Sequence, residues 1–370
     1  MFRTSSAAGR FGLTALAAAG CAAALIPSVA AAAPSSGGNA HSKPAVSEAA
    51  WAAGRAAHGS DVTASEALAA YWTPERMRAS TPAEESDFFK GAVAQHERTS
   101  AAQRREAKQK VARGERPAKE GKPVSILPAA GQAPVEAAFN PNLSYWTTTA
   151  RTNGKVFFTK GGQSFVCSGA IVNSEGADTV WTAGHCVHGG SGGTWHTNWT
   201  FVPAYDDDLS NPRPYGTWSA NRLHTRNAWI NSSDYAEDMG VATMNTNLGG
   251  WHIVNYFGGH GFRVNQGKNV WENAFGYPAE SPFDGGNLMR CWGTSSPEWT
   301  VFWFTSETIK IPCDMTRGSS GGPWLHGYDG NYGYLNGVNS RIDRIVGPTI
   351  MLSPYFDDTA LSLYNYTRYM

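Results

Sequence analysis

The C-terminal part of this chain consists of short apolar runs separated by turn-forming residues. Beginning near Asn142, runs rich in Val, Ile, Phe, Tyr, Trp and Thr alternate with clusters of Gly, Asn, Pro and Asp, for example GKVFFT, GAIVN, TVWTA, GVATM, NVWENAFGY and EWTVFWFTS. Many short strands with turn signals between them predict an all-β barrel or sandwich. Only the end differs, because Asp357 and Asp358 precede a helix-compatible run, and acidic residues suit a helix N-terminus. We therefore expect one C-terminal helix on a β-protein.

The N-terminus has the layout of a secretory signal. Arg3 and Arg10 precede an apolar stretch from Phe11 to about Val29, and the small residues Ala30 to Ala33 follow. This order of charge, apolar run and small residues is typical of a cleaved signal peptide. We predict a signal peptide over residues 1–33 and a secreted protein. No later stretch has the roughly 18 uninterrupted apolar residues of a membrane span, so we expect no membrane partner after cleavage.

Residues 34–140 differ in composition from the rest of the chain. They are rich in Ala, Glu, Arg, Lys and Gln and contain no cysteine. The stretches SEALAAYW and SAAQRREAKQKVAR favour helix, and several prolines interrupt the later part. We predict a partly helical pro-segment, helical or partly disordered, that partners the domain over residues 141–370; the alternative is a solvated linker. A monomer is expected.

The cysteines indicate an oxidising compartment. Five are present, and removal of the predicted signal peptide would remove Cys21 and leave an even number. The remaining four allow three pairings. We predict Cys167 with Cys186 and Cys291 with Cys313, because each pair closes a local loop of moderate length.

Charge and ligand spacing argue against several classes of partner. The chain has 30 basic and 30 acidic residues, so no strong field favours nucleic acid. His188 lies close to Cys186, but no second pair of ligands occurs at zinc spacing. The acidic loop at residues 206–208 lacks the spacing of a calcium loop. We expect neither a metal nor a cofactor.

Three motifs point to nucleophilic catalysis. The run from Arg317 to Pro323 places Ser320 among glycines, which permit a tight turn with backbone N–H groups directed at an oxyanion. The strand-like Asp178–Trp181 leads into Thr182-Ala183-Gly184-His185-Cys186, where His185 suits a general base. The third group is a carboxylate that orients the histidine. Asp238 comes directly before a strand-like run, and Asp234 is the alternative.

The order of these residues separates two kinds of hydrolase. The order is His, Asp, Ser, with separations of 53 and 82 residues (238 − 185 and 320 − 238). Gly318 to Gly322 also fits the G-x-S-x-G motif of α/β-hydrolases, but that fold requires Asp and then His after the serine. His326 is the only later histidine, and it precedes every later Asp, so the lipase or esterase interpretation is disfavoured.

The motif series resembles that of trypsin-like (chymotrypsin-fold) serine peptidases, and most of all the secreted bacterial members related to glutamyl endopeptidases. The resemblance rests on CSGAIV, TAGHC, DMGVA and GSSGGP, with FGYP, FVPAY and PYGTW in support, and it covers about residues 145 to 365. It implies two packed six-stranded antiparallel β-barrels and peptide-bond hydrolysis through an acyl-enzyme. It also implies a triad of His185, Asp238 and Ser320, with the oxyanion hole at the backbone N–H groups of Gly318 and Ser320. Cys167 and Cys186 match the disulfide beside the catalytic histidine.

The resemblance is incomplete where activation and specificity are set. Ser319 stands where animal trypsins carry an Asp that pairs with a new N-terminus, so activation takes another form. Asp314 matches the position with which trypsins bind Lys or Arg, which requires a buried carboxylate. Asn339 replaces the histidine that glutamyl endopeptidases use, and an asparagine carries no charge; Arg341 could supply one. Cleavage after Lys/Arg or after Glu stays open.

We therefore predict a secreted serine endopeptidase that acts on protein or peptide substrates. Two alternatives belong to other classes, a non-catalytic binding protein with a protease fold and an esterase. All three triad residues are present, which favours the enzyme over the binding protein.

Overall fold

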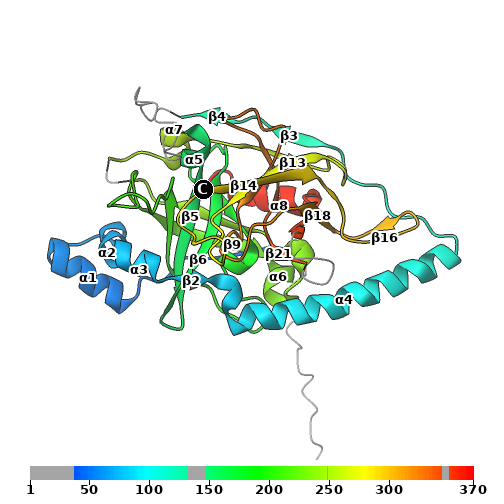
Figure 1. Ribbon diagram of the computed structural model, residues 1–370, viewed down its shortest axis with the longest axis horizontal. Coiled ribbons are helices and arrows are strands. Elements are labelled where there is room, and N and C mark those ends of the chain that lie inside the picture. Colours follow the sequence, from blue (N-terminus) through cyan, green and yellow to red (C-terminus); the bar gives the residue numbers. More distant parts are fainter. Residues whose placement is uncertain (1–36, 132–146, 248, 344–349) are drawn as a thin grey trace, which may run out of the picture. The chain divides into compact units, whose positions relative to one another are not determined.

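The computed structural model describes residues 37–131, 147–247, 249–343 and 350–370 (Figure 1). The predicted signal peptide, residues 1–33, is outside the described residues. Within the described ranges, the search for membrane spans identifies no helix with the length and apolar character needed to cross a bilayer.

Six antiparallel strands close into a barrel. The order is β9-β10-β7-β6-β5-β8, and β8 pairs again with β9, which closes the ring. Large apolar side chains such as Phe158, Trp181 and Phe201 fill its core. The expected all-β barrel is thus present in this part of the chain. Its strands are β5 (Asn153–Lys160), β6 (Gln163–Ile171), β7 (Thr179–Thr182), β8 (Thr197–Pro203), β9 (Trp218–Arg226) and β10 (Gly240–Met244).

The remaining strands form open sheets. A six-stranded sheet has the order β14-β13-β19-β20-β12-β3, and a four-stranded sheet has the order β15-β18-β22-β21. A closed second barrel is not confirmed by the pairings of the described residues, and β12 pairs with β20 in parallel, unlike the expected antiparallel arrangement. These strands are β12 (Gly261–Val264), β13 (Trp271–Gly276), β14 (Met289–Thr294), β15 (Ser296–Pro297), β18 (Thr308–Pro312), β19 (Pro323–His326), β20 (Tyr334–Val338), β21 (Arg341–Ile342) and β22 (Ile350–Pro354).

The run EWTVFWFTS is a hairpin of two very short strands. β16 (Thr300–Val301) pairs with β17 (Phe304–Thr305), and Phe302 between them has a positive φ of 55°. A residue with a left-handed backbone conformation reverses the chain direction here, so a run that composition alone would assign to one strand forms two.

Residues 37–131 are packed on the β-rich part. They supply one strand to the barrel sheet, where β1 pairs with β9, and one edge strand to the six-stranded sheet, where β3 pairs with β12. Both pairings are antiparallel. Trp72 is fully buried, and its indole N–H donates to the carbonyl of Asn198 at 2.8 Å. Both stretches that favoured helix lie in helices, within or at the ends of α2 and α4. The elements are β1 (Asn39–Ser42), α1 (Glu48–His58), α2 (Ala64–Tyr71), α3 (Pro74–Arg78), β2 (Thr81–Pro82), the 3-10 helix η1 (Ala83–Glu85), α4 (Asp87–Ala112), β3 (Val124–Ile126) and β4 (Ala129–Ala130).

The C-terminal helix and both predicted disulfides are confirmed. α8 (Asp358–Thr367) begins after Asp357, whose side chain accepts a hydrogen bond from the Thr359 backbone. Cys167 pairs with Cys186, and Cys291 pairs with Cys313. Short helices complete the fold: α5 (Thr148–Thr152), η3 (Gly184–Cys186), α6 (Asn227–Ser232), η4 (Tyr235–Glu237) and α7 (Ile253–Phe257), the last leading into β11 (Gly258–Gly259), which pairs with β4.

Candidate active site

Ser320 lies on a glycine turn between β18 and β19. Gly318 has a φ of 94° and Gly321 a φ of 80°, conformations that L side chains rarely adopt. Asn339 holds the turn from behind, because its side-chain amide donates to the carbonyl of Ser319 at 2.9 Å and its own carbonyl accepts from the Gly321 N–H at 2.7 Å. These hydrogen bonds hold the turn in a form in which the Gly318 N–H and the Ser320 hydroxyl donate to the same acceptor, which is described below.

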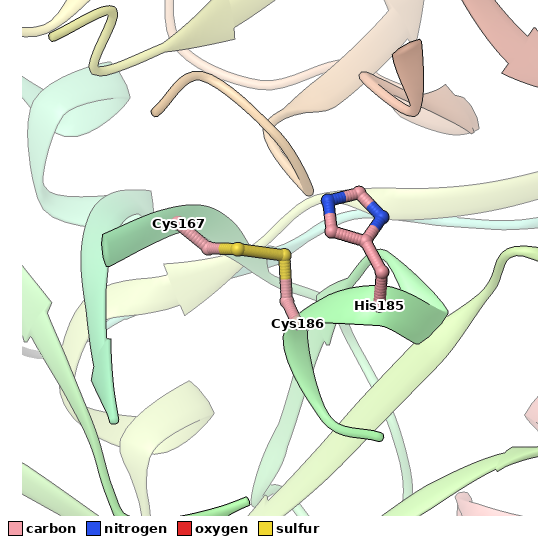
Figure 2. A group of neighbouring side chains, drawn as sticks. All are labelled: Cys167, His185 and Cys186. Carbon is pink, nitrogen blue, oxygen red and sulfur yellow. A yellow bond between two sulfur atoms is a disulfide. The ribbon is translucent and has the colours of Figure 1, made fainter. Parts of the chain in front are cut away.

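His185 lies in η3, directly after β7, beside the disulfide that joins Cys167 to Cys186 (Figure 2). The side chains of these three residues lie within 4.8 Å of one another, but both sulfurs are consumed by the disulfide and cannot bind a metal as thiolates. His196 supports the loop, since its Nε2 donates to the carbonyl of His185 at 2.9 Å. Burial lowers the pKa of His196 to about 3, so this imidazole is neutral.

Asp238 precedes β10 and is hydrogen-bonded to His185. Its two carboxylate oxygens accept from the backbone N–H of His185 and from Nδ1 of the same residue, both at 2.8 Å, and the hydroxyl of Ser340 donates to it at 2.6 Å. Burial lowers the pKa of His185, but the charge and hydrogen bond of Asp238, with a further contribution from Glu84, outweigh burial and raise it. Asp234, the alternative, is bonded instead to the backbone N–H of Ala236 at the start of η4.

The hydroxyl of Ser320 is bonded to a residue from the N-terminal region. It donates to Oε1 of Glu84, and the Gly318 N–H donates to the same oxygen at 3.1 Å. Nε2 of His185 is buried and has no hydrogen-bond partner among the described residues. The structure thus brings together His185 and Asp238, while the hydrogen bond of the serine goes to Glu84.

The three residues considered for specificity have different surroundings. Asp314 is exposed, so it lacks the burial on which a pocket for Lys or Arg depends. Asn339 is fully buried, and its side chain is fully engaged: it donates to the carbonyls of Ser319 and Phe275 and accepts from the indole of Trp324. We conclude that Asn339 has a supporting position behind the serine turn. The Asn339 side chain thus has no unbonded group for a substrate, and the exposed Asp314 does not form the floor of a buried pocket.

Arg341 lines a cavity of about 700 Å³ that also contains Ser320 and residues of α4. It pairs with Glu298 at 2.8 Å and contacts His96 of α4 at 2.7 Å. Burial alone would raise the pKa of Glu298, but the hydrogen bond from His96 and the charge of Arg341 hold it well below its usual range. Of the two charged specificity candidates, Arg341 lines this cavity together with the candidate catalytic serine, and Asp314 does not.

Three contacts at the site were not expected from sequence. Ser340 lies between Asn339 and Arg341, within the stretch that was compared for specificity, but no pattern marked it as a partner of Asp238. His196 was not marked because a single histidine in a strand-rich region carries no motif. Glu84 lies in a region far away in sequence, and only the folded structure places it at the serine.

Comparisons with known proteins identify the class. No family model and no curated protein matches the sequence. Among solved structures, the thermostable serine protease AL20 from an extremophilic microorganism is 38% identical, with a TM-score of 0.55, over 60% of this chain and 98% of that one. The protease Anisep from Arthrobacter nicotinovorans is 38% identical, with a TM-score of 0.54, over 60% of this chain and 97% of that one. A Glu endopeptidase in complex with MPD is 18% identical, with a TM-score of 0.48, over 65% of this chain and 99% of that one.

The chain therefore belongs to the trypsin-like serine peptidases, as its motifs predict. It is a serine endopeptidase, a hydrolase of peptide bonds.

Proposed function

We propose that this protein is a secreted serine endopeptidase in which Ser320 is the nucleophile, His185 the general base and Asp238 the carboxylate that orients the base. The observation that carries this assignment is the hydrogen bond of 2.8 Å between Nδ1 of His185 and the buried Asp238, because it leaves Nε2 as the proton acceptor. The likeness to two serine proteases at 38% identity supports it.

The chemistry follows from these positions. Oγ of Ser320 attacks the carbonyl carbon of the scissile peptide, and its proton moves to Nε2 of His185. The imidazolium then gives this proton to the leaving amine, the C–N bond breaks, and an acyl-enzyme remains. A water molecule then attacks the acyl carbon while Nε2 of His185 takes its proton; the imidazolium returns this proton to Oγ of Ser320, the bond between Oγ and the acyl carbon breaks, and the carboxylic acid is released. Asp238 stabilises the imidazolium in both halves of the reaction.

The backbone N–H groups of Gly318 and Ser320 are assigned to the oxyanion hole. Gly318 has a positive φ, which an L side chain rarely adopts, and its N–H and the Ser320 hydroxyl both donate to Oε1 of Glu84. Fixed N–H donors stabilise the negative charge that develops on the substrate oxygen. The contact of the Gly318 N–H with a carboxylate oxygen supports the assignment, because an oxygen of Glu84 accepts a hydrogen bond at that place.

We further propose that residues 34–140 are a pro-segment and residues 141–370 the peptidase domain. Burial of Trp72 and the contacts of α4 around the serine favour this assignment over a solvated linker. Two disulfides suit the extracellular location that the predicted signal peptide implies.

Labelling by a fluorophosphonate tests the function. We expect the processed enzyme to be modified at Ser320 and to cleave an unfolded protein substrate, and the Ser320→Ala variant to do neither. Absence of label in the processed wild type would favour a non-catalytic binding protein. Hydrolysis of a simple ester without peptide cleavage would indicate an esterase.

A further inference from the structure

We propose that Glu84 is an inhibitory carboxylate that fills the oxyanion hole of the unprocessed chain, as the carboxylate of a cleaved product would. This inference rests on the proposed function, because it takes the catalytic assignment of Ser320 and Gly318 as given. It identifies the kind of ligand that the site binds, a carboxylate, and the residue of the chain that supplies it.

Glu84 accepts from one N–H of the proposed oxyanion hole and from the hydroxyl of the proposed nucleophile. One oxygen, Oε1, accepts hydrogen bonds from the Ser320 hydroxyl and from the Gly318 N–H, the second at 3.1 Å, and Oε2 lies 3.3 Å from the same N–H. Glu84 is itself buried. A buried carboxylate is stable only where donors compensate for lost hydration, and here the catalytic groups are the donors that the structure provides.

Glu84 also removes the nucleophile from its base. A serine hydroxyl has one hydrogen to donate, and in the described structure that hydrogen goes to Glu84. Nε2 of His185 accordingly lacks a partner. The same carboxylate therefore blocks two steps. It prevents substrate binding because it occupies the place of the substrate oxygen, and it prevents proton transfer to His185 because it accepts the hydrogen bond of the Ser320 hydroxyl.

The contact at the serine is not that of a substrate. The group at Ser320 is a side-chain carboxylate, whose carbon is a poor electrophile because the negative charge is shared by both oxygens. It has no amine to release, so attack by Ser320 leads to no cleavage. The backbone just before it is paired in parallel register with β6, where Thr81 lies opposite Phe165 and Pro82 opposite Val166.

Anchors on both sides keep Glu84 in place. Before it, the pairing of β2 with β6 fixes the chain. After it, α4 places the ring of Phe89 edge-on against the imidazole of His185, with 4.8 Å between ring centroids. Farther along α4, His96 contacts both Arg341 at 2.7 Å and Glu298 at 3.5 Å. Tethering of this kind gives the carboxylate a high effective concentration at the serine, so one weak ligand becomes an effective inhibitor.

The test measures how fast Ser320 reacts in the intact chain. A small fluorophosphonate is added to the unprocessed full-length protein and to the processed enzyme, and modification of Ser320 is followed by mass spectrometry, which also verifies that the chain is uncut. We expect the unprocessed wild type to react at least about ten-fold more slowly, because loss of a charge-assisted hydrogen bond has effects of about this size or larger. Glu84→Ala should restore about ten-fold or more of the rate in the unprocessed chain.

A matched control comes from the next residue. Glu85 lies in the same 3-10 helix but is exposed, so Glu85→Ala should react as slowly as the wild type. Equal rates for the Glu84 and Glu85 variants would overturn the proposal. If Glu84→Ala does not fold, as judged by thermal unfolding, the wild type alone decides, because equal rates before and after processing refute inhibition by Glu84.

The two proposals fail in different ways. A processed enzyme that is never modified at Ser320 would refute the catalytic assignment itself. A processed enzyme that reacts, together with an unprocessed chain that reacts as fast, would leave the catalytic assignment intact and refute the role of Glu84.

Discussion

Replacing Asp238 by Asn tests the orientation of the candidate base. The oxygen that accepts from the His185 backbone N–H must remain an oxygen, because that N–H can only donate. The amide nitrogen of Asn therefore takes the place of the oxygen that now faces Nδ1 of His185 and the hydroxyl of Ser340. An N–H in that place makes Nδ1 an acceptor, so the proton of the imidazole moves to Nε2.

The expected loss is large because the wrong tautomer cannot accept the serine proton. A forced tautomer of this kind lowers kcat about 10⁴-fold in a Ser-His-Asp triad. At about 1.36 kcal/mol per factor of ten, this is about 5.4 kcal/mol of activation free energy. The assay is kcat and KM of the processed enzyme on a peptide substrate, and KM should change little.

Asp234 provides the control for this substitution. Its carboxylate accepts from the Ala236 N–H and is not bonded to His185 in the structure, so Asp234→Asn should keep kcat within about three-fold, the change expected from a local capping effect. A decrease in Asp238→Asn of less than ten-fold, or an equal decrease in both variants, would refute the assignment of Asp238.

Four further predictions concern pH, stability and specificity. Neighbouring carboxylates, Glu84 included, outweigh burial and raise the pKa of His185, so Glu84→Ala should lower that pKa in an NMR titration. Because only the neutral imidazole accepts a proton, kcat/KM should fall as the pH drops below the pKa of His185, and an unchanged rate in acid would contradict its role. Replacing Cys167 and Cys186 by Ser removes a link across 19 residues and should cost about 3 kcal/mol in urea unfolding; unchanged stability would contradict the estimate. Asp314→Ser should leave the termini of cleavage products unchanged, because its carboxylate is exposed; a lost Lys/Arg preference would show the opposite.

Local signals in the sequence predicted much of the fold. These signals are two pairs of cysteines that lie near each other in sequence, a run that follows two aspartates, and short apolar runs. They correctly predicted both disulfides, α8 and the strands of the barrel. The hairpin of β16 and β17 escaped prediction because a left-handed Phe302 has no sequence signature. The open sheets were missed because closure depends on pairings between distant strands.

The candidate site was predictable only where a motif covers it. His185, Asp238 and Ser320 lie in motifs, and the structure bonds the first two to each other. The partner of the serine could not be predicted, because Glu84 reaches it through the packing of β2 and α4. The interpretation of Asp314 depended on burial, which a position relative to Ser320 does not reveal.

The strands that residues 37–131 contribute have a consequence for the kinetics of activation. β1 is hydrogen-bonded along β9, and β3 along β12, so hydrolysis of one peptide bond after β4 leaves these ladders intact. We expect cutting and dissociation to be separate events, with a nicked complex between them. The lifetime of this nicked complex would be set by the rate at which β1 and β3 separate from β9 and β12, and it would not depend on enzyme concentration. Separation would also leave unpaired edges on β9 and β12, which are surfaces to which other extended chains can add.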